Sequence, residues 1–349
     1  MRLAPALILL IASAALLSAG EPGDSVEPVL VRLGPLTLNP SAFLELIGMS
    51  RSATTADSVS THFGNIPLED TPGESLGSPR HSRLMLKGDV PAGPFHFSAY
   101  LESDFLNFTP GQSPYRWRHY WGQAQIGNWE ILGGQTWSLL RSNRVGTGMD
   151  AMNTDVIDPA YHVGLIGSRL RQIRVSRTMG IYKAAVAWEG VGNFVAKVVR
   201  DTERQHYELA GFGGRTGRAG VAASAVAGVT PRFRLVTQAY WSQRAAYEAL
   251  AVVPVGVNGV STLQGIEAHI KKNLEVYSYG GLVYAARGDA SGNRLVRQWT
   301  AGVNQKVSLP SLRSGLLMSL QYSYLDRAIW AGKEGVMNFL MYRVRYTFN

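Results

Sequence analysis

Several arginines in the sequence are spaced two residues apart, among them the pairs Arg116 and Arg118, Arg169 and Arg171, and Arg343 and Arg345. A guanidinium keeps its charge at any accessible pH, and its planar donors bind carboxylates or phosphates in a bidentate manner. Successive side chains of a β-strand point to opposite faces, so both members of each pair lie on one face if these segments are strands. Arginines presented in this way would concentrate small anions and guide them through weak successive sites.

Arg174 and Arg177 extend this series, although their spacing of three residues breaks the two-residue period of a strand. We include Arg174 with the six paired arginines as a candidate pore-lining, anion-selecting residue. A more ordinary interpretation stays open, in which some of these arginines only pair with carboxylates on the wall. The sequence offers three acidic residues for such pairs: Glu102, Asp104 and Glu130.

The last eleven residues, FLMYRVRYTFN (339–349), show the type of element that would carry these arginines. An apolar row alternates with a polar row: Tyr342, Val344, Tyr346 and Phe348 against Arg343, Arg345 and Thr347. This alternation predicts a β-strand with two different faces. A soluble sheet would bury the aromatic row, whereas a wide membrane barrel would place that row in lipid and the arginines in a watery lumen.

The same alternation recurs along the chain and is broken by short turn clusters. Sixteen segments fit it: 41–50, 81–91, 94–105, 115–127, 129–137, 164–179, 180–189, 192–200, 205–214, 217–228, 231–242, 260–272, 274–287, 295–308, 312–325 and 335–348. Some connections are short (127–129, 214–217, 228–231, 272–274, 309–311) and others long (51–80, 138–163, 243–259, 287–294). Short turns at one end and long loops at the other are typical of a transmembrane barrel. We therefore predict an all-β fold, a transmembrane antiparallel up-and-down β-barrel of about 16 strands over residues 41–349.

Residues 1–20, MRLAPALILLIASAALLSAG, have the form of a cleaved signal peptide. One basic residue precedes an apolar run, and small residues stand before Glu21. The run is shorter than the ~20 residues of a membrane helix. The sequence thus predicts export, followed by an N-terminal extension (21–40) with four prolines. Neither this extension nor the segment 51–80 has a role that the sequence reveals.

The composition agrees with an ordered, exported chain. Charged residues make up 17%, against roughly 25% in typical soluble domains. The net charge of +9 becomes +8 once Arg2 is removed with the signal peptide. An exported protein rarely meets a nucleic-acid duplex, so we expect no nucleic-acid partner. The chain has no cysteine and therefore no disulfide framework.

Residues 82–137 carry a more specific pattern. Its pieces are SRLMLKGD (82–89), FHFSAYLESDF (95–105) and YRWRHYWGQAQIGNWEILGGQTWSLL (115–140), with a weaker piece in SRLRQIRVSR (168–177). An Arg-x-Arg-His-aromatic-x-Gly strand is followed by a hairpin into Gly-Gln-Thr-Trp-Ser. This arrangement resembles the DcaP-like trimeric porins of Gram-negative outer membranes.

The resemblance implies a sixteen-stranded barrel in the outer membrane, three copies per assembly, and diffusion of small anionic solutes such as dicarboxylates without a cofactor. Loop 138–163 corresponds in position to the inward-folding constriction loop. Its charged residues are Arg141, Arg144, Asp150, Asp155 and Asp158, and a transverse field would arise where its carboxylates face the arginines. Tyr342, Tyr346 and Phe348 would form the signal that the barrel-assembly machinery reads, although Asn349 follows them.

Other functions find less support in the residues. The seven histidines are scattered, and no metal-binding, P-loop or Gly-x-Ser-x-Gly motif occurs. An outer-membrane lipase or protease would have to use His119 with Ser138. A regular strand would place His119 opposite Arg116 and Arg118, toward lipid or a subunit contact. The other alternative is a soluble β-sandwich that binds carbohydrate through Trp117 and Trp121. We interpret the aromatic residues of this region instead as a girdle at the membrane interface: Trp117, Tyr120, Trp121, Trp129 and Trp137.

Overall fold

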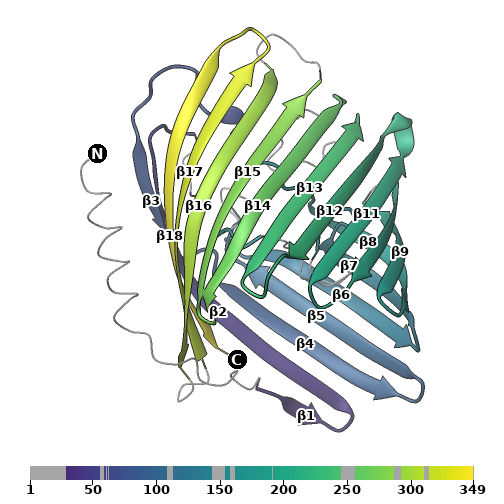
Figure 1. The fold of residues 1–349 in the computed structure, drawn as a ribbon. Coiled ribbons are helices and arrows are strands. Elements are labelled where there is room, and N and C mark those ends of the chain that lie inside the picture. Colours follow the sequence, from purple (N-terminus) through teal and green to yellow (C-terminus); the bar gives the residue numbers. More distant parts are fainter. Residues whose placement is uncertain are drawn as a thin grey trace.

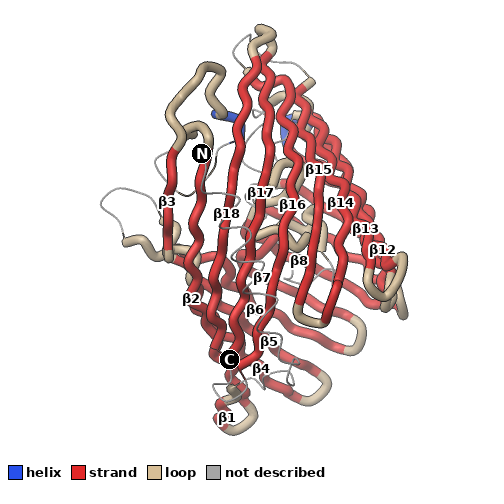
Figure 2. Tube along the Cα trace, turned by 60° about the vertical axis from the view of Figure 1, so that its left-hand side comes forward, coloured by secondary structure: helices blue, strands red, loops and turns tan. Residues whose placement is uncertain are grey.

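The computed structural model describes residues 29–55, 59, 61, 63–107, 113–143, 154–157, 162–190, 192–244, 256–286, 292–309 and 314–348. These residues form one antiparallel sheet that closes on itself (Figure 1). Strands make up almost all of the chain trace in Figure 2. Among the described residues, no helix has the length and apolar character needed to cross a bilayer.

The strands are β1 (Val31–Leu33), β2 (Leu36–Arg51), β3 (Glu74–Ser78), β4 (Arg83–Ala92), β5 (Phe95–Asp104), β6 (Arg116–Ile126), β7 (Trp129–Trp137), β8 (Arg169–Met179), β9 (Tyr182–Glu189), β10 (Asn193–Asp201), β11 (Gln205–Gly214), β12 (Ala219–Gly228), β13 (Phe233–Gln243), β14 (Gly259–Lys271), β15 (Leu274–Ala285), β16 (Asn293–Leu309), β17 (Ser314–Ile329) and β18 (Glu334–Phe348). Two single-turn helices, η1 (Phe63–Asn65) and η3 (Arg215–Gly217), lie in connections.

The barrel closes where β18 pairs with β2, in a register that runs from Phe339 opposite Arg51 to Phe348 opposite Ala42. On its other side β2 pairs with β4 through residues 37–43 and with β3 through residues 47–51. The ring therefore contains β2 and β4 to β18, which confirms the predicted sixteen strands. β1 only folds back on the first residues of β2 and extends the sheet beyond the end of β18.

Some boundaries differ from the sequence prediction. The wall begins at Leu36, so the last residues of the predicted extension 21–40 belong to the first strand. β8 begins at Arg169 rather than at residue 164, because residues 162–168 continue the preceding loop. β17 continues to Ile329, and β3 interrupts the long connection 51–80. Hairpins 190–192, 215–218 and 330–333 lie at the same rim as the long loops although they are short.

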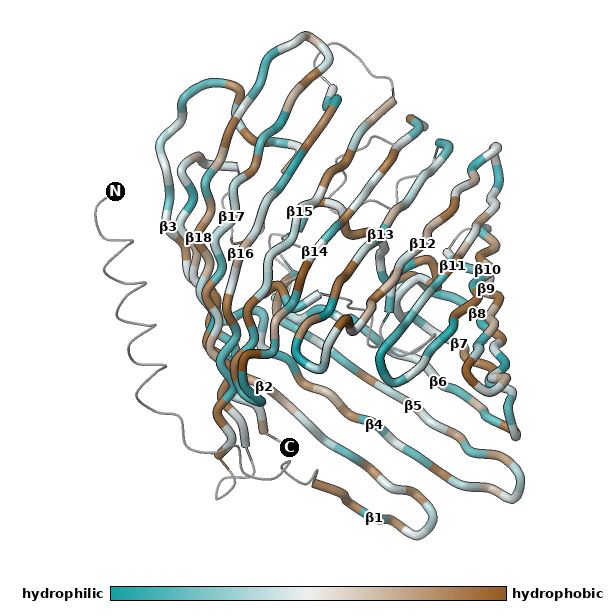
Figure 3. The backbone as a smooth tube through the Cα atoms, in the orientation of Figure 1, coloured by the Kyte–Doolittle hydropathy of each residue, from teal (hydrophilic) through white to brown (hydrophobic). Residues whose placement is uncertain are grey.

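The outer face of the barrel is the row of each strand that exposes large apolar side chains. Hydrophobic and hydrophilic positions alternate along the strands in Figure 3. Aromatic side chains of this row gather near both rims. Phe95, Trp129, Tyr182, Phe233 and Phe348 stand at the short-turn rim, and Trp117, Trp188, Phe194 and Trp241 at the long-loop rim. Two aromatic girdles separated by an aliphatic band are the outer surface of a transmembrane barrel.

The inner face differs from a uniformly watery lumen. An apolar cluster joins β2, β15, β16, β17 and β18 to two inward loops, and includes Phe63, Ile157, Val163, Met337 and Phe339. A second cluster joins Leu139, Leu140 and Ile166 to the inner face of β9 to β13. The described parts of connections 52–82 and 138–168 that belong to these clusters thus pack against the inner wall.

Gly134 of β7 has a φ of 135°, a conformation that other residues rarely adopt. A Cβ there would also overlap the carbonyl oxygen of Tyr120 on β6. We expect Gly134→Ala to lower the free energy of unfolding by about 1–3 kcal/mol, measured by urea unfolding of the barrel in detergent micelles. Gly133→Ala is the matched control, because nothing lies within 4 Å of a Cβ at that position. Equal urea midpoints for the two variants would contradict this assignment.

Candidate functional site

A β-bulge in β6 organises the charged part of the inner wall. Arg116 lies opposite Asp104 of β5 and Trp117 opposite Ser103, but Glu102 pairs with His119, so Arg118 is the extra residue. A bulge shifts the alternation by one position. As a result Arg118 and His119 are both buried toward the interior. The prediction that His119 faces lipid or a subunit contact was therefore wrong.

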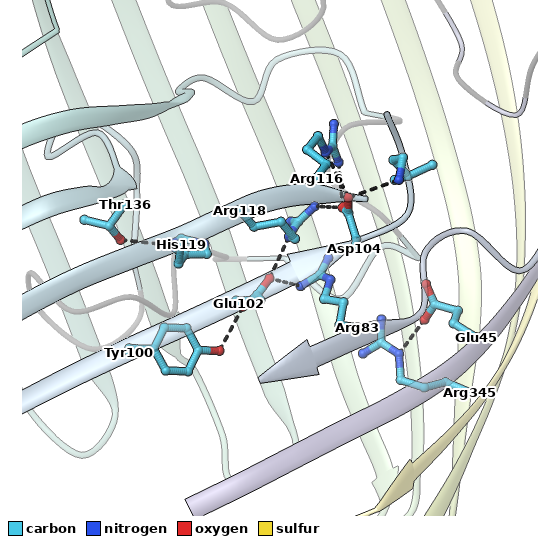
Figure 4. Close-up of polar contacts among 11 residues, drawn as sticks. Glu45, Arg83, Tyr100, Glu102, Asp104, Arg116, Arg118, His119, Thr136 and Arg345 are labelled. Atoms are coloured by element: carbon cyan, nitrogen blue, oxygen red, sulfur yellow. Dashed lines mark hydrogen bonds and ion pairs between the residues drawn. The ribbon is translucent and has the colours of Figure 1, made fainter. Parts of the chain in front are cut away.

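Two carboxylates at the end of β5 bind this segment (Figure 4). Arg116 donates from Nε and Nη2 to the two carboxylate oxygens of Asp104, at 2.9 and 2.6 Å. Arg118 bridges both acids, with Nη1 2.6 Å from Asp104 Oδ2 and Nε 2.6 Å from Glu102 Oε1. Glu102 also accepts from Arg83 Nη1 of β4 at 3.1 Å and from the Tyr100 hydroxyl at 2.9 Å.

The carboxylates of this cluster are buried, whereas most of its guanidiniums are partly exposed; Arg118, at 8%, is as buried as Glu102. The side chains of Asp104 and Glu102 are 0% and 8% exposed, whereas those of Arg116 and Arg83 are 37% and 23% exposed. Arg345 of β18 repeats the arrangement: it binds a buried carboxylate, Glu45 of β2, and keeps 23% of its own side chain exposed. Its guanidinium also stacks on Phe43 at 4.1 Å. Water in the barrel therefore meets guanidiniums, with the carboxylates behind them.

The remaining inner arginines are held more tightly. Arg169, at the start of β8, stacks on the Trp137 ring at 4.7 Å and lies within electrostatic range of Arg116 and Arg118. Arg174 is buried and donates to the Gln172 side chain and to the Trp137 carbonyl. Arg343 donates to the Ile157 carbonyl at 2.6 Å, and its Nη2 lies 2.8 Å from the Ser319 hydroxyl. Arg343 thus binds an inward loop to β17 and β18.

Arg171 and Arg177 lie on the outer face. Both share a row with Ile173, whose side chain is exposed. Arg171 donates from Nε to the Tyr120 hydroxyl at 3.2 Å, and Arg177 stacks on Trp129 at 5.0 Å. The prediction that Arg171 shares the inner face with Arg169 was therefore wrong, and the inner row of β8 runs through Gln172, Arg174 and Ser176. We therefore remove Arg171 from the candidate pore-lining residues.

The first arm of the inward loop, residues 138–143, is anchored by buried charges of the wall. Glu189 of β9 accepts from the Ser138 hydroxyl at 2.7 Å and from the Leu139 amide at 2.5 Å. Lys197 of β10 donates to the Arg141 carbonyl at 2.8 Å and lies 2.8 Å from Glu208 of β11. Because the buried acids accept from backbone amides and a lysine, the loop's polar groups are satisfied inside the barrel.

The second arm, residues 154–157 and 162–168, docks against β14 to β18. The Val163 amide donates to Gln298 at 2.7 Å, and the Ile157 amide donates to Gln321 at 3.0 Å. Burial lowers the pKa of His162 to about 4, so this ring is neutral at pH 7. Arg141 connects the two arms by donating to the Ile166 carbonyl at 3.3 Å. Of the charged residues predicted in this loop, Arg144, Asp150 and Asp158 lie outside the described residues.

Asp155 lies between the loop and the wall rather than free in the lumen. Arg234 Nη2 is 3.6 Å from Asp155 Oδ2 and 2.9 Å from Glu267 Oε2. Together with His269, these two acids place three potential metal ligands within 4.8 Å of one another. Arg234 already supplies a positive charge to Asp155 and Glu267, so ion pairing between the loop and the wall is the simplest function of these residues.

The residues nominated for the alternative functions are not brought together. His119 Nδ1 lies 3.0 Å from the Thr136 hydroxyl, whereas the Ser138 hydroxyl donates to Glu189. Trp117 is on the outer face, and Trp121 is buried inside, where its ring lies 5.8 Å from that of Tyr100. The bulge between them places the two tryptophans on opposite faces of the barrel wall, so they cannot bind the same sugar. Trp121 is also no part of the outer girdle.

Several residues of the site were missed by the sequence analysis: Glu45, Arg83, Glu189, Lys197, Glu208, Arg234 and Glu267. Each is a charged residue on the inner row of its strand. Glu45 in SAFLELIGM and Lys197 in NFVAKVVR stand alone among apolar residues. A lone charge in an apolar alternating run could have marked them, because such a charge is tolerated only with a partner.

The loop meets the wall closely at Gly281 of β15, where a Cβ would overlap the carbonyl oxygen of Val163. We expect Gly281→Val to push the loop away from the wall and to raise single-channel conductance in a planar bilayer. Gly280→Val is the matched control, because its Cβ would meet nothing within 4 Å on the outer face. The same conductance for both variants would show that this contact does not hold the loop.

No protein-family model matches this chain, and no curated protein matches it either. Solved structures do match. The outer membrane channel DcaP of Acinetobacter baumannii aligns with a TM-score of 0.75 and 18% identity over 91% of this chain and 99% of that chain. Salmonella typhi OmpF, in complex with daunomycin, gives a TM-score of 0.64 and 9% identity over 92% and 100%.

The trimer form of in-vitro folded OmpT, an outer membrane protein of Vibrio cholerae, gives a TM-score of 0.59 and 8% identity over 90% and 99%. At these identities the likeness concerns the fold. It extends over nearly the whole length of each protein, and the DcaP match confirms for the fold the resemblance first seen in residues 82–137. The chain has the fold of porin-like outer-membrane channels.

Proposed function

We propose that the protein is a porin of the outer membrane of a Gram-negative-type bacterium. It forms a water-filled channel for passive diffusion of small hydrophilic solutes, with a preference for anions such as dicarboxylates. One observation carries the anion preference: in the charged cluster of the inner wall, the guanidiniums of Arg83, Arg116 and Arg345 are partly exposed to water, and the carboxylates that pair with them are buried. In this proposal the protein only lets solutes pass and carries out no covalent chemistry.

The membrane location is supported by the barrel itself. Closure between β18 and β2 leaves no exposed sheet edge along the paired residues, and the outer rows are apolar with aromatic residues at both rims. The short-turn rim would face the periplasm, and the long-loop rim the exterior. Residues 1–20 lie outside the described residues, and we retain their proposed function as an export signal.

Selectivity would follow from the charge balance of this cluster. Arg83, Arg116, Arg118 and Arg345 face three carboxylates, so the cluster keeps one net positive charge before Arg169 is added. An anion in a channel with low-dielectric walls is attracted by such a surface, and the bidentate geometry of guanidinium suits carboxylates. Because the arginines are already paired, each contact with a solute is weak, which permits release.

The inward loop would narrow this channel. Its first arm is anchored to β9, β10 and β11, and its second arm to β14 to β18, so the loop runs between separate parts of the wall. Arg141 is buried within the loop base, where it stacks on Trp137 at 4.0 Å. We assign this residue to holding the loop rather than to contact with solutes.

The outer face of β2 to β7 supports assembly into a homotrimer. It contains an apolar hollow of about 580 Å³, whose lining combines larger apolar side chains with small residues, among them Gly88, Ala99, Gly122 and Gly133. Small side chains let two backbones approach closely within a membrane. A second copy of this chain would cover the hollow, and V. cholerae OmpT, which shares the fold, has a trimer form. Tyr342, Tyr346 and Phe348 form the outward row of β18, available for recognition by the barrel-assembly machinery.

We expect Arg116→Gln to lower the anion preference of the channel. Asp104 keeps Arg118 as a partner in this variant, so the fold should be preserved while one exposed positive charge is lost. The measurement is the reversal potential of single channels in a planar bilayer under a tenfold salt gradient, which we expect to shift by several millivolts toward cation preference.

The matched control is Arg171→Gln, which removes the same charge from the outer face. We expect its reversal potential to equal that of the wild type. A cation-selective wild-type channel would refute the anion preference but keep the porin. A folded, membrane-extracted protein that gives no channels would refute the porin itself.

We expect Gly122→Phe to abolish the trimer while leaving the monomer folded. Nothing lies within 4 Å of a Cβ at Gly122, so the new ring fits the isolated barrel but fills the hollow. Sedimentation in detergent reports the assembly state, and heat-modifiable migration on gels reports folding. Gly280→Phe, on the outer face of β15, should remain trimeric. A trimer in both variants would exclude this face as the subunit contact.

A further inference from the structure

Two groups of side chains at the short-turn rim have the same composition: a lysine, a carboxylate and a histidine. The first mouth group belongs to the β4–β5 hairpin, where Asp89 Oδ2 is 3.1 Å from Lys87 Nζ and Asp89 Oδ1 is 3.0 Å from His96 Nε2. His96 is on the inner row of β5, because its neighbours Phe95 and Phe97 are exposed on the outer face. A proton taken up by His96 therefore adds a positive charge inside the barrel, at its short-turn opening.

The second mouth group extends over β14, β15 and β16. Glu275 Oε1 is 2.6 Å from Lys306 Nζ and 3.4 Å from His269 Nδ1. His269 is on the inner row of β14, because Ile266 and Ile270 are exposed on the outer face. Along the shorter way round the ring, β2, β17 and β18 separate this group from β4. The two groups therefore face the opening from different parts of the wall.

The bases of both groups are more exposed than the acids. In the first mouth group the lysine and histidine side chains are 43% and 46% exposed, and the carboxylate side chain is 23% exposed. In the second the corresponding values are 53% and 27%, against 11% for the carboxylate. A solute that passes the short-turn opening can therefore reach both imidazoles.

A third group of the same composition is shielded from the opening. Glu208 Oε1 is 2.8 Å from Lys197 Nζ and 2.9 Å from His206 Nε2, and the His206 side chain is only 6% exposed. Glu208 also accepts from the Asn143 amide at 3.0 Å. This buried group holds the inward loop, and His206 supplies a matched control for the two exposed histidines.

The permanent charges around His96 are balanced or positive. Within the first mouth group the lysine compensates Asp89. In the register row of His96, Glu130 of β7 is the charged residue two strands away, and it pairs with Lys183 at 2.9 Å. Arg32 of β1 lies two strands away in the register row of Asp89. Protonation of His96 thus makes this side of the opening distinctly positive.

The surroundings of His269 contain more acids. Arg234 lies 2.9 Å from Glu267 and 3.6 Å from Asp155, and both acids have an oxygen within 4.8 Å of a ring nitrogen of His269. Together with the lysine and the carboxylate of the second mouth group, two cations face three carboxylates, and Lys271 follows at the end of the strand. Protonation of His269 compensates the remaining negative charge.

We propose that the two mouth groups form a second anion-selecting site of the channel, one whose strength depends on protonation of His96 and His269. An unperturbed histidine titrates near pH 6.5, so acidification adds up to two positive charges at this opening. Inorganic anions and carboxylate solutes are then attracted there as well as to the arginine cluster nearer the long-loop rim. The proposal rests on the proposed channel function, which supplies the path of the solutes.

Reversal potentials of single channels under a tenfold gradient of potassium chloride, at pH 7.5 and pH 4.5, test this site. We expect the ratio of chloride to potassium permeability of the wild type to rise at least twofold on acidification. The double variant His96→Gln with His269→Gln should lose most of this rise. The double variant His96→Lys with His269→Lys should have the higher ratio already at pH 7.5. The two variants move selectivity in opposite directions, which a general disturbance of the barrel would not do.

His206→Gln is the matched control, because its ring is buried and a glutamine amide can still donate to Glu208. We expect it to keep the response of the wild type to pH. An unchanged response in the double glutamine variant, or an equal loss of response in His206→Gln, would overturn the proposal.

The same recordings separate the mouth site from the channel function. Arg116→Gln should lower the anion preference at both pH values and keep the rise on acidification. A wild type that conducts with the same permeability ratio at both pH values refutes the mouth site alone, whereas a folded protein without channels refutes the channel function.

Discussion

A peptide group inside a bilayer has no water to bond with, and this constraint decides the architecture of the protein. Every strand must find a partner on both sides, so the sheet has to close, and it closes where β18 meets β2 from Phe339 opposite Arg51 to Phe348 opposite Ala42. The first and last strands of the wall are therefore joined although they are at opposite ends of the sequence. The period of two then divides each strand into a lipid row and an interior row.

The interior row has to satisfy a second requirement, because the connections 52–82 and 138–168 fold into the barrel and bring their own backbone groups with them. Buried wall side chains bind these groups: Glu189 and Lys197 bind residues 138–141, and Gln298, Gln321 and Arg343 bind Ile157 and Val163. Close approach is possible where glycines face the loop, as at Gly281 against Val163. The loop is thus part of the folded interior, and the channel is what remains beside it.

Negative charges in this interior lie deeper in the wall than most of the positive charges that pair with them. The carboxylates of Glu45, Glu102 and Asp104 are almost fully covered, and the guanidiniums of Arg83, Arg116 and Arg345 that pair with them remain partly in water. A buried carboxylate without a partner would be costly, so each acid fixes one or two arginines in place. The bulge at Arg118 concentrates this effect by turning Arg116, Arg118 and His119 to the same side. One local irregularity thereby produces both the most basic part of the wall and the separation of Trp117 from Trp121.

The sequence by itself determined the class of fold, the sixteen wall strands and the lipid-facing row of β18, because alternation of apolar and polar residues is a local property that a membrane barrel requires in every strand. It also located arginines near the interior, and residues 82–137 carried a family resemblance. Only the tertiary structure decided which arginines face the lumen. A bulge reverses the parity after Arg118, the alternation of β8 places Arg171 in the lipid row from the start of that strand, and Arg343 binds a loop that lies far from it in the chain. The buried acids and the path of the inward loop depend on contacts between residues as distant as Ser138 and Glu189 or Ile157 and Arg343, and such pairings leave no periodic signal in the sequence.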